Sequence, residues 1–461
     1  MAISSWWTAG LPAGRDEATI AFLPFYLGLA AVLGVWLALY HCDRPRTLRR
    51  YAAAVALPLL GAAPFGRDLW AYAAQGNLVR HGLDPYAVGP SALPGAFADQ
   101  VSPRWLSSPA PYGPLWLRIS HLAVDLSANH PVVAALLLRL PALGGLALLL
   151  WAVPRLADAL DLKTAVPRGL WLGAVAPLTV VLGVGGGHND LPMLGLALAG
   201  LAIATRPGLR SVALGAAVVG LAVMIKSPAA FALPFAVPVW LRAAGRPTTA
   251  RSVITSCVAA LVGGGLAAGV ITVAAGLGTG WTHQVNADAQ WISWLSLPCA
   301  VVMFGRWVGQ AGAIKQLDDT LRAARHAGTA LTFAIALVLW VLALRAKTGR
   351  TVVAALAGTL GAAALLAPSV QPWYYCWGLA LAGLVATKRW WLTVLAAVAL
   401  MFPVMIMPSG SGLESDWRAL PVIAAALAVC GVTVRDHRRQ TTHPMTPGPR
   451  CAPSTAPSSE T

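Results

Sequence analysis

The stretch Gly66-Arg67-Asp68-Leu69-Trp70-Ala71-Tyr72 marks the place where an apolar, span-like run ends and the longest polar interruption of the first third begins. A carboxylate at the edge of a membrane is costly unless it faces water, protein or a ligand. Asp68 is therefore a candidate general base that takes a proton from a hydroxyl. The alternative is a helix N-cap, but Ala71 excludes the reciprocal capping box.

Composition places this stretch in a membrane protein. The 461 residues are 57% hydrophobic and only 11% charged, whereas a soluble domain carries roughly a quarter charged residues. The sequence predicts an all-α, polytopic integral membrane protein. We expect thirteen spans, at about residues 22–40, 51–66, 131–153, 169–185, 190–205, 211–225, 228–240, 252–276, 329–345, 351–367, 373–386, 391–407 and 418–434.

The net charge of +16 comes from basic clusters in the short connections between apolar runs. Such clusters mark the cytoplasmic side of a membrane, so the charge indicates topology and not a nucleic-acid partner. The clusters predict an extracytoplasmic N-terminus (1–21), a transmembrane domain (22–435) and a disordered cytoplasmic tail (436–461). Asp68 then lies outside. The six cysteines are scattered, without metal-ligand spacing, so no metal and no cofactor are expected.

Two segments have amphipathic patterns that are typical of helices lying at a membrane surface. Residues 115–126 carry Leu115, Leu122 and Leu126 on one face. Residues 313–326 repeat the pattern and precede the span predicted at 329–345. We therefore expect two large outer-face loops, 67–130 and 277–328, each bearing an interfacial helix.

Other polar residues interrupt the predicted spans near the same face. Three glycines precede His188, Asn189 and Asp190, and allow a ligand to approach the backbone, although Asn189 or Asp190 alone is also a suitable helix cap. Lys226 is either a phosphate ligand or a snorkelling lysine. Asp84, followed by proline, is typical of a turn. Trp373 and the tyrosine after it are interfacial aromatics or sugar-stacking residues.

Taken in order, five motifs resemble the actinobacterial alpha-1,6-mannopyranosyltransferases, which belong to the GT-C glycosyltransferase superfamily. They are Gly66-Arg67-Asp68-Leu69-Trp70-Ala71-Tyr72-Ala73-Ala74-Gln75-Gly76, Gly82-Leu83-Asp84-Pro85-Tyr86, Pro111-Tyr112-Gly113-Pro114-Leu115, Gly187-His188-Asn189-Asp190 and Gln371-Pro372-Trp373-Tyr374. The resemblance covers about residues 50–435. It implies a membrane-embedded mannosyltransferase that takes its sugar from a polyprenyl phosphate, without a metal, and acts on a glycan or glycolipid outside the plasma membrane.

The resemblance also implies roles for single residues. Asp68 corresponds to the catalytic base of the superfamily. Lys226, Arg67 and Arg306 are candidates for binding the donor phosphate. The substrate-binding candidates are Tyr72, Gln75, Asp84, Tyr86, Tyr112, His188, Asn189, Asp190, Trp373 and Tyr374. A flippase or transporter for lipid-linked glycans is the alternative, but the expected pairing of two related halves is not evident.

Overall fold

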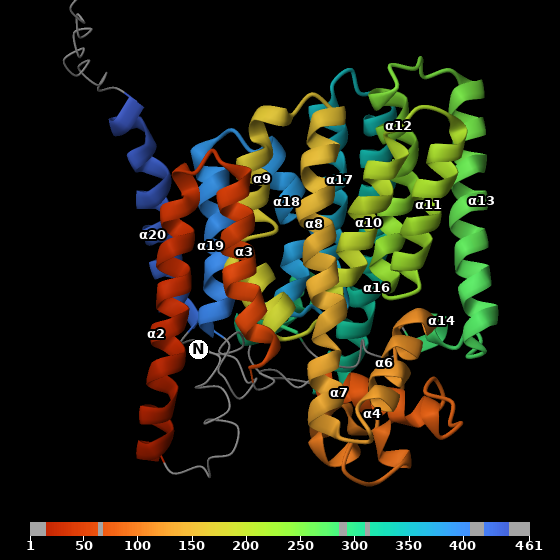
Figure 1. Cartoon of the computed structure of the whole chain (residues 1–461), viewed down its shortest axis with the longest axis vertical. Coiled ribbons are helices and arrows are strands. Elements are labelled where there is room, and N and C mark those ends of the chain that lie inside the picture. The colour runs from red at the N-terminus through yellow and green to blue at the C-terminus, as the bar shows by residue number, and fades with distance from the viewer. Residues whose placement is uncertain (1–14, 63–67, 285–292, 309–313, 406–418, 442–461) are drawn as a thin grey trace, which may run out of the picture.

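The computed structural model describes residues 15–62, 68–284, 293–308, 314–405 and 419–441. Within these ranges every regular element is a helix (Figure 1). The longer helices are α2 (Arg15–Ala38), α3 (Pro45–Leu60), α4 (Asp68–Arg80), α6 (Pro114–Leu126), α7 (Pro131–Leu137), α8 (Arg139–Ala159), α9 (Val166–Leu172), α10 (Asp190–Ala204), α11 (Leu209–Val223), α12 (Ala236–Ala243), α13 (Ala250–Ala275), α15 (Leu297–Val308), α16 (Ile314–Leu344), α17 (Gly349–Leu366), α18 (Cys376–Val385), α19 (Arg389–Met405) and α20 (Ala419–Thr441).

The prediction of an all-helical, multi-pass membrane protein is confirmed, but the count of thirteen spans is not. Among the described residues, five helical stretches are long and apolar enough to cross a membrane: Pro24–His41, Pro131–Ala159, Ala250–Ala275, Leu317–Leu344 and Gly349–Leu366. Four further apolar helices in the same ranges are shorter. Helix α20 continues to Thr441, beyond the position where the tail was expected to begin.

The spans predicted at 169–185, 228–240 and 373–386 each contain a 3-10 or π-helical segment. The span expected at 169–185 consists of α9 and the π-helix η5 (Leu178–Gly185). The span expected at 228–240 consists of the 3-10 helix η6 (Ser227–Phe235) and α12. The span expected at 373–386 begins with the 3-10 helix η8 (Pro372–Tyr375) before α18. Irregular backbone at this depth is tolerated only inside protein or along a cavity, so these interruptions indicate where a site lies.

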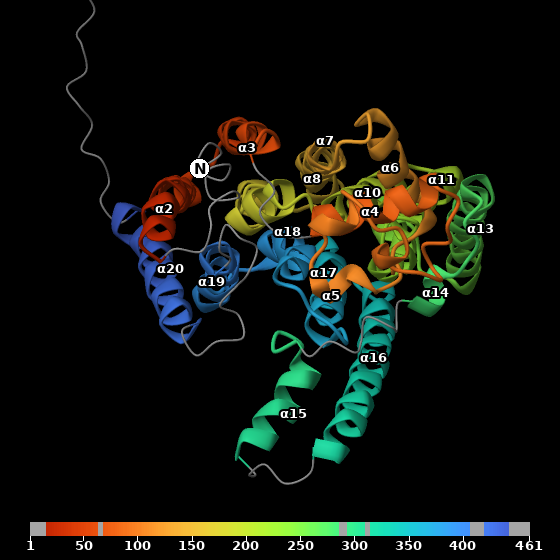
Figure 2. The same ribbon diagram turned by 90° about the horizontal axis from the view of Figure 1, so that it is seen from below.

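The predicted interfacial helix at 313–326 is wrong as a separate element. It forms one continuous helix, α16, with the apolar segment that follows. Gly328 does not end this helix, and it serves close packing instead. A Cβ atom at this position would lie 2.5 Å from Pro298 Cγ and 2.8 Å from the carbonyl oxygen of Leu366. Seen from below, α15 and α16 extend away from the main helical body (Figure 2).

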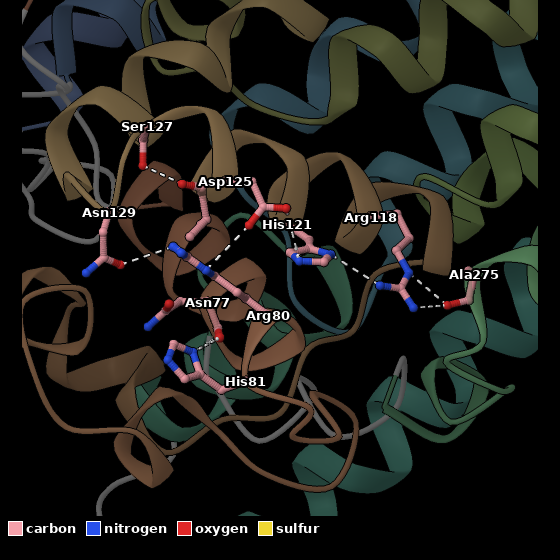
Figure 3. A network of polar contacts seen from close by, with 10 residues as sticks. Asn77, Arg80, His81, Arg118, His121, Asp125, Ser127, Asn129 and Ala275 are labelled. Carbon is pink, nitrogen blue, oxygen red and sulfur yellow. Dashed lines mark hydrogen bonds and ion pairs between the residues drawn. The ribbon is translucent and has the colours of Figure 1, made fainter.

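The amphipathic helix predicted at 115–126 is confirmed as α6. Its leucine face stays open, since Leu122 and Leu126 are 56% and 66% exposed, while Trp116 and Leu117 are buried. A polar network on the other side joins α6 to two neighbouring helices (Figure 3).

In this network, Asp125 lies 3.4 Å from Arg80 of α4 and 3.3 Å from His121. Arg118 donates through Nε to the carbonyl oxygen of Ala275, 2.8 Å away at the end of α13. Helices α4 and α6 are thus tied to the spans, at the end of the molecule opposite the α2–α3, α8–α9 and α12–α13 connections (Figure 1).

Candidate functional site

Asp68 is the first residue of α4, and its side chain is 17% exposed. It lines a cavity of about 700 Å³. The first turn of a helix favours a carboxylate, because the backbone N–H groups and the helix dipole are positive there. Asp68 therefore combines a position favourable to a carboxylate with a place in the cavity wall.

The glycine-rich connection before α10 brings a histidine next to Asp68. Gly187 has a φ of +62°, and a Cβ atom there would overlap the side chain of Leu69, so only glycine fits. The next residue, His188, is buried, and its Nδ1 lies 3.4 Å from Asp68 Oδ2. That distance suits an ion pair, but the orientation does not make a hydrogen bond. The His188 ring stacks on Trp373 at 3.5 Å between centroids.

Lys226 is buried beside the same cavity and does not snorkel. The backbone before it is paired with the motif that launches α6: Gly113 donates to the carbonyl of Ile225 at 3.2 Å, and Leu115 to that of Met224 at 3.0 Å. This pairing places Lys226 close to Tyr112.

A carboxylate and a tyrosine ring surround the Lys226 ammonium. Lys226 Nζ lies 2.8 Å from Asp190 Oδ2 and 4.3 Å from the centre of the Tyr374 ring. Trp377 Nε1 donates to the other Asp190 oxygen at 2.7 Å, and the Trp377 ring stacks on Tyr374. Buried charges persist only when paired and hydrogen-bonded, and both conditions hold for Asp190.

The cavity has a polar end and an apolar arm. Asp68, Lys226, Tyr112, Gln371 and Tyr374 form the polar end. The apolar arm runs between η6, α16 and the end of α17, and is lined by Phe231, Pro234, Phe235, Phe333, Ala336, Leu337, Trp340, Ala363 and Leu366. Such a cavity suits a ligand with a charged head and a long apolar tail.

Tyr72 and Asn189 lie behind the cavity wall. The Tyr72 hydroxyl donates to Asn189 Oδ1 at 3.4 Å, and the ring packs edge-on against Tyr112 and Trp116. Burial raises the pKa of Tyr72 well above its usual value, and the nearby acidic groups of Tyr112, Asp68 and Asp190 raise it further. Tyr72 therefore stays protonated and supports the site as a hydrogen-bond donor. Asn189 makes no side-chain cap, although it occupies the cap position of α10.

Asp84 and Tyr86 lie outside the cavity. Asp84 is exposed and accepts a hydrogen bond from the backbone of Tyr86 at 2.9 Å, which supports the turn interpretation. The Tyr86 hydroxyl donates to the carbonyl of Tyr112 at 3.2 Å. Gln75 is buried on α4 and lines a small side pocket together with Asp68.

Two of the predicted phosphate ligands remain without a described position. Arg67 lies outside the described residues, and so does the side chain of Arg306, whose backbone is part of α15. In the described part of the chain, no group of three or more His, Cys, Asp and Glu residues could hold a metal ion.

Two residues that matter to the site were missed from the sequence. Trp377 follows Tyr374 by three residues, a spacing that could have predicted their stacking. Arg139 is fully buried at the start of α8, and Nε donates to the carbonyl of Gly185 at 2.9 Å. It also donates to the carbonyls of Leu60 and Ala62. No local sequence pattern predicts the contacts of Arg139 with these three carbonyls.

Comparison with known proteins gives consistent matches. Residues 3–242 match the family model described as alpha-(1->6)-mannopyranosyltransferase, N-terminal domain, and residues 298–435 match that of the MptB C-terminal domain. The chain is 34% identical to alpha-(1->6)-mannopyranosyltransferase A of Mycobacterium tuberculosis, over 87% of this chain and 77% of that protein. It is 28% identical to alpha-(1->6)-mannopyranosyltransferase A of Corynebacterium glutamicum, over 84% and 80%.

The membrane-spanning helices and the carboxylate that lines an amphipathic cavity, taken with these matches, define a membrane-embedded glycosyltransferase. The matches span most of the chain and include the segments that carry Asp68, His188 and Lys226. The chain belongs to the actinobacterial alpha-(1->6)-mannopyranosyltransferase family, and it is an enzyme of the mannosyltransferase class.

Proposed function

We propose that this enzyme moves a mannosyl unit from a polyprenyl phosphate to a hydroxyl of an alpha-1,6-mannan-type glycan or glycolipid, on the outer side of the plasma membrane. The observation that carries the proposal is the cavity, in which Asp68 and Lys226 lie at one end of a long apolar arm. A nucleotide sugar has no long apolar part to fill that arm, whereas a prenyl chain does.

In the proposed reaction, an Asp68 oxygen takes the proton from the acceptor hydroxyl while the hydroxyl oxygen attacks C1 of the mannosyl unit. The bond between C1 and the phosphate oxygen breaks, and polyprenyl phosphate leaves with the electron pair. A single displacement inverts the configuration at C1, so a β-linked donor gives an α-linked product. A positioned base contributes about 10²–10⁴-fold in rate.

Lys226 and Tyr374 are suited to the leaving phosphate. A cation held near the departing oxygens stabilises the charge that develops on them. Asp190 holds the Lys226 ammonium in place with one hydrogen bond. An ammonium has three donors, so two more N–H groups of Lys226 can bind phosphate oxygens. His188, between Asp68 and Trp373, borders the base on its buried side.

The outer location is supported by where the basic residues lie. Basic residues gather at the α2–α3 connection and the first turns of α3 (Arg44, Arg46, Arg49 and Arg50), and at the end of α12 and the connection after it (Arg242 and Arg246). Both connections lie at the end opposite α4 and α6 (Figure 1). Basic connections usually face the cytoplasm, and this supports an outer position for Asp68.

The test is a transfer assay with purified protein, labelled polyprenyl-phosphate mannose and a synthetic alpha-1,6-dimannoside. Asp68→Asn keeps the shape and the helix preference of the side chain but removes the basic carboxylate. Turnover should fall by about two to four orders of magnitude, with donor binding near that of the wild type.

Asp84→Asn is the matched control, because Asp84 is an exposed turn residue away from the cavity and Asn keeps the turn. Its turnover should stay near the wild-type value. A fully active Asp68→Asn enzyme would overturn the assignment of the base, and a wild-type protein that transfers no mannose from this donor would overturn the proposed function.

A further inference from the structure

A second, smaller cavity opens beside Asp68. Its volume is about 20 Å³, and Asp68, Trp105 and Tyr112 line both cavities. Gln75 and Ser108 line only the smaller one, which we call the side pocket. Asp68 therefore borders two cavities, the main one with Lys226 and the side pocket with Gln75 and Ser108.

Gln75 brings an unused hydrogen-bonding group to the side pocket. The side chain is 4% exposed, and its carbonyl oxygen has no hydrogen-bond partner among the residues that the structure describes. Leaving such an oxygen unpaired in the protein interior is unfavourable. Asp68, Tyr72 and Gln75 follow the helical spacing that brings residues to one face of α4. The pocket is thus built for a ligand that donates a hydrogen bond.

The rim of the side pocket is held in place by the turn at Asp84. Ala110 donates from its backbone to the carbonyl of Pro85 at 2.8 Å, and Tyr86 holds the carbonyl of Tyr112. Trp105 and Ser108 at the rim are partly exposed, so the pocket is reachable. The Gly82-Leu83-Asp84-Pro85-Tyr86 motif, which does not line the main cavity, thus supports the side pocket through Pro85 and Tyr86.

We infer that the side pocket binds the attacking hydroxyl of the acceptor sugar, and that the Gln75 amide binds the acceptor there. An inverting displacement requires the nucleophile and the leaving group on opposite faces of the transferred sugar. With the phosphate at Lys226, the acceptor oxygen has to reach Asp68 from the other side. This inference rests on the proposed function and specifies its acceptor subsite.

The size of the side pocket agrees with this occupant. A pocket needs roughly 10–15 Å³ to hold one water molecule, so about 20 Å³ accommodates one hydroxyl group but not a sugar ring. The ring then lies at the rim, beside the half-buried Trp105. A permanently bound structural water is the rival occupant.

The experiment compares two variants of buried amides on α4. Gln75→Met keeps the length of the side chain and removes its hydrogen-bonding groups. Asn77→Leu is the matched control, since Asn77 is also buried with an unpaired side-chain oxygen but lines neither cavity. The probes are octyl alpha-1,6-dimannoside as acceptor and labelled polyprenyl-phosphate mannose as donor. Acceptor KM, donor KM and equilibrium binding of the dimannoside alone are measured.

Gln75→Met should raise the acceptor KM and the dimannoside Kd about tenfold, which corresponds to about 1.4 kcal/mol. Its donor KM should change less than about twofold, and Asn77→Leu should change none of the three. Unchanged acceptor KM and Kd in Gln75→Met would leave only a structural water and overturn the inference. A wild-type protein that binds the dimannoside through Gln75 but transfers no mannose would instead overturn the proposed function alone.

Discussion

At the scale of single residues, Asp190 and Lys226 depend on each other. Asp190 is 1% exposed, and its two oxygens are shared between Lys226 and Trp377. Removing one partner of a buried pair leaves an uncompensated charge, which costs about 3–5 kcal/mol. A single substitution of Lys226 therefore mixes a loss of folding with any loss of phosphate binding.

The two effects are separable with a double variant. Lys226→Met should lower the yield of monodisperse protein, because Asp190 then keeps an unpaired charge. Adding Asp190→Asn should restore the yield but leave the donor KM raised at least tenfold. Size-exclusion chromatography and donor saturation measure the two quantities. A double variant with wild-type donor KM would show that Lys226 does not contact the phosphate.

At the scale of elements, the site lies where helices end. The π-helix η5 ends three residues before His188, and α3 ends shortly before the segment that leads to Asp68. The last carbonyls of a helix have no partner within the helix, and they attract cations. The planar guanidinium of Arg139 donates to a carbonyl at the end of η5 and to another at the end of α3. The end of α3 and the end of η5, which leads to His188, are thereby joined.

Arg139→Lys tests this arrangement. An ammonium is a compact charge and does not reproduce the fork of a guanidinium, so at least one buried carbonyl loses its partner, at a cost of about 1–3 kcal/mol. We expect a lower unfolding temperature in detergent and a lower kcat. Arg155→Lys, on the exposed face of the same helix, is the control and should change both quantities little. Equal effects of the two variants would contradict a special role for Arg139.

At the scale of the whole molecule, the basic connections lie at one end and the α4–α6 region at the other. With native cysteines replaced, Ser107→Cys and Thr279→Cys should react with an impermeant thiol reagent in intact cells, because both positions are exposed at the α4–α6 end. Lys347→Cys, in the α16–α17 connection, should react only after permeabilisation. The opposite pattern would place the site on the cytoplasmic side.

Composition and charge pattern were enough to predict the fold class, because apolar runs of about twenty residues are typical of transmembrane helices. They could not predict the breaks at η5, η6 and η8, since these depend on tertiary packing around the cavity. The pattern at 313–326 was misjudged because one continuous helix can be polar in its first turns and apolar afterwards.

The site was only partly predictable for a similar reason. Asp68, His188 and Lys226 stood out because polar residues are rare near apolar runs. The partners that these and other site residues contact could not be predicted. Asp190 and Lys226 are 36 residues apart in the sequence, and Arg139 and Gly185 are 46 apart. Contacts at such separations have no periodic signal in a single sequence.

The apolar arm has a further consequence for substrate range. A volume of about 700 Å³ is that of a pocket for a small organic ligand, and a long polyprenyl chain exceeds it. For the proposed donor, only the isoprene units nearest the phosphate fit inside, and the remainder of the chain stays among the lipids. The enzyme should therefore distinguish donors by the saturation and geometry of those first units, and tolerate wide variation in total chain length.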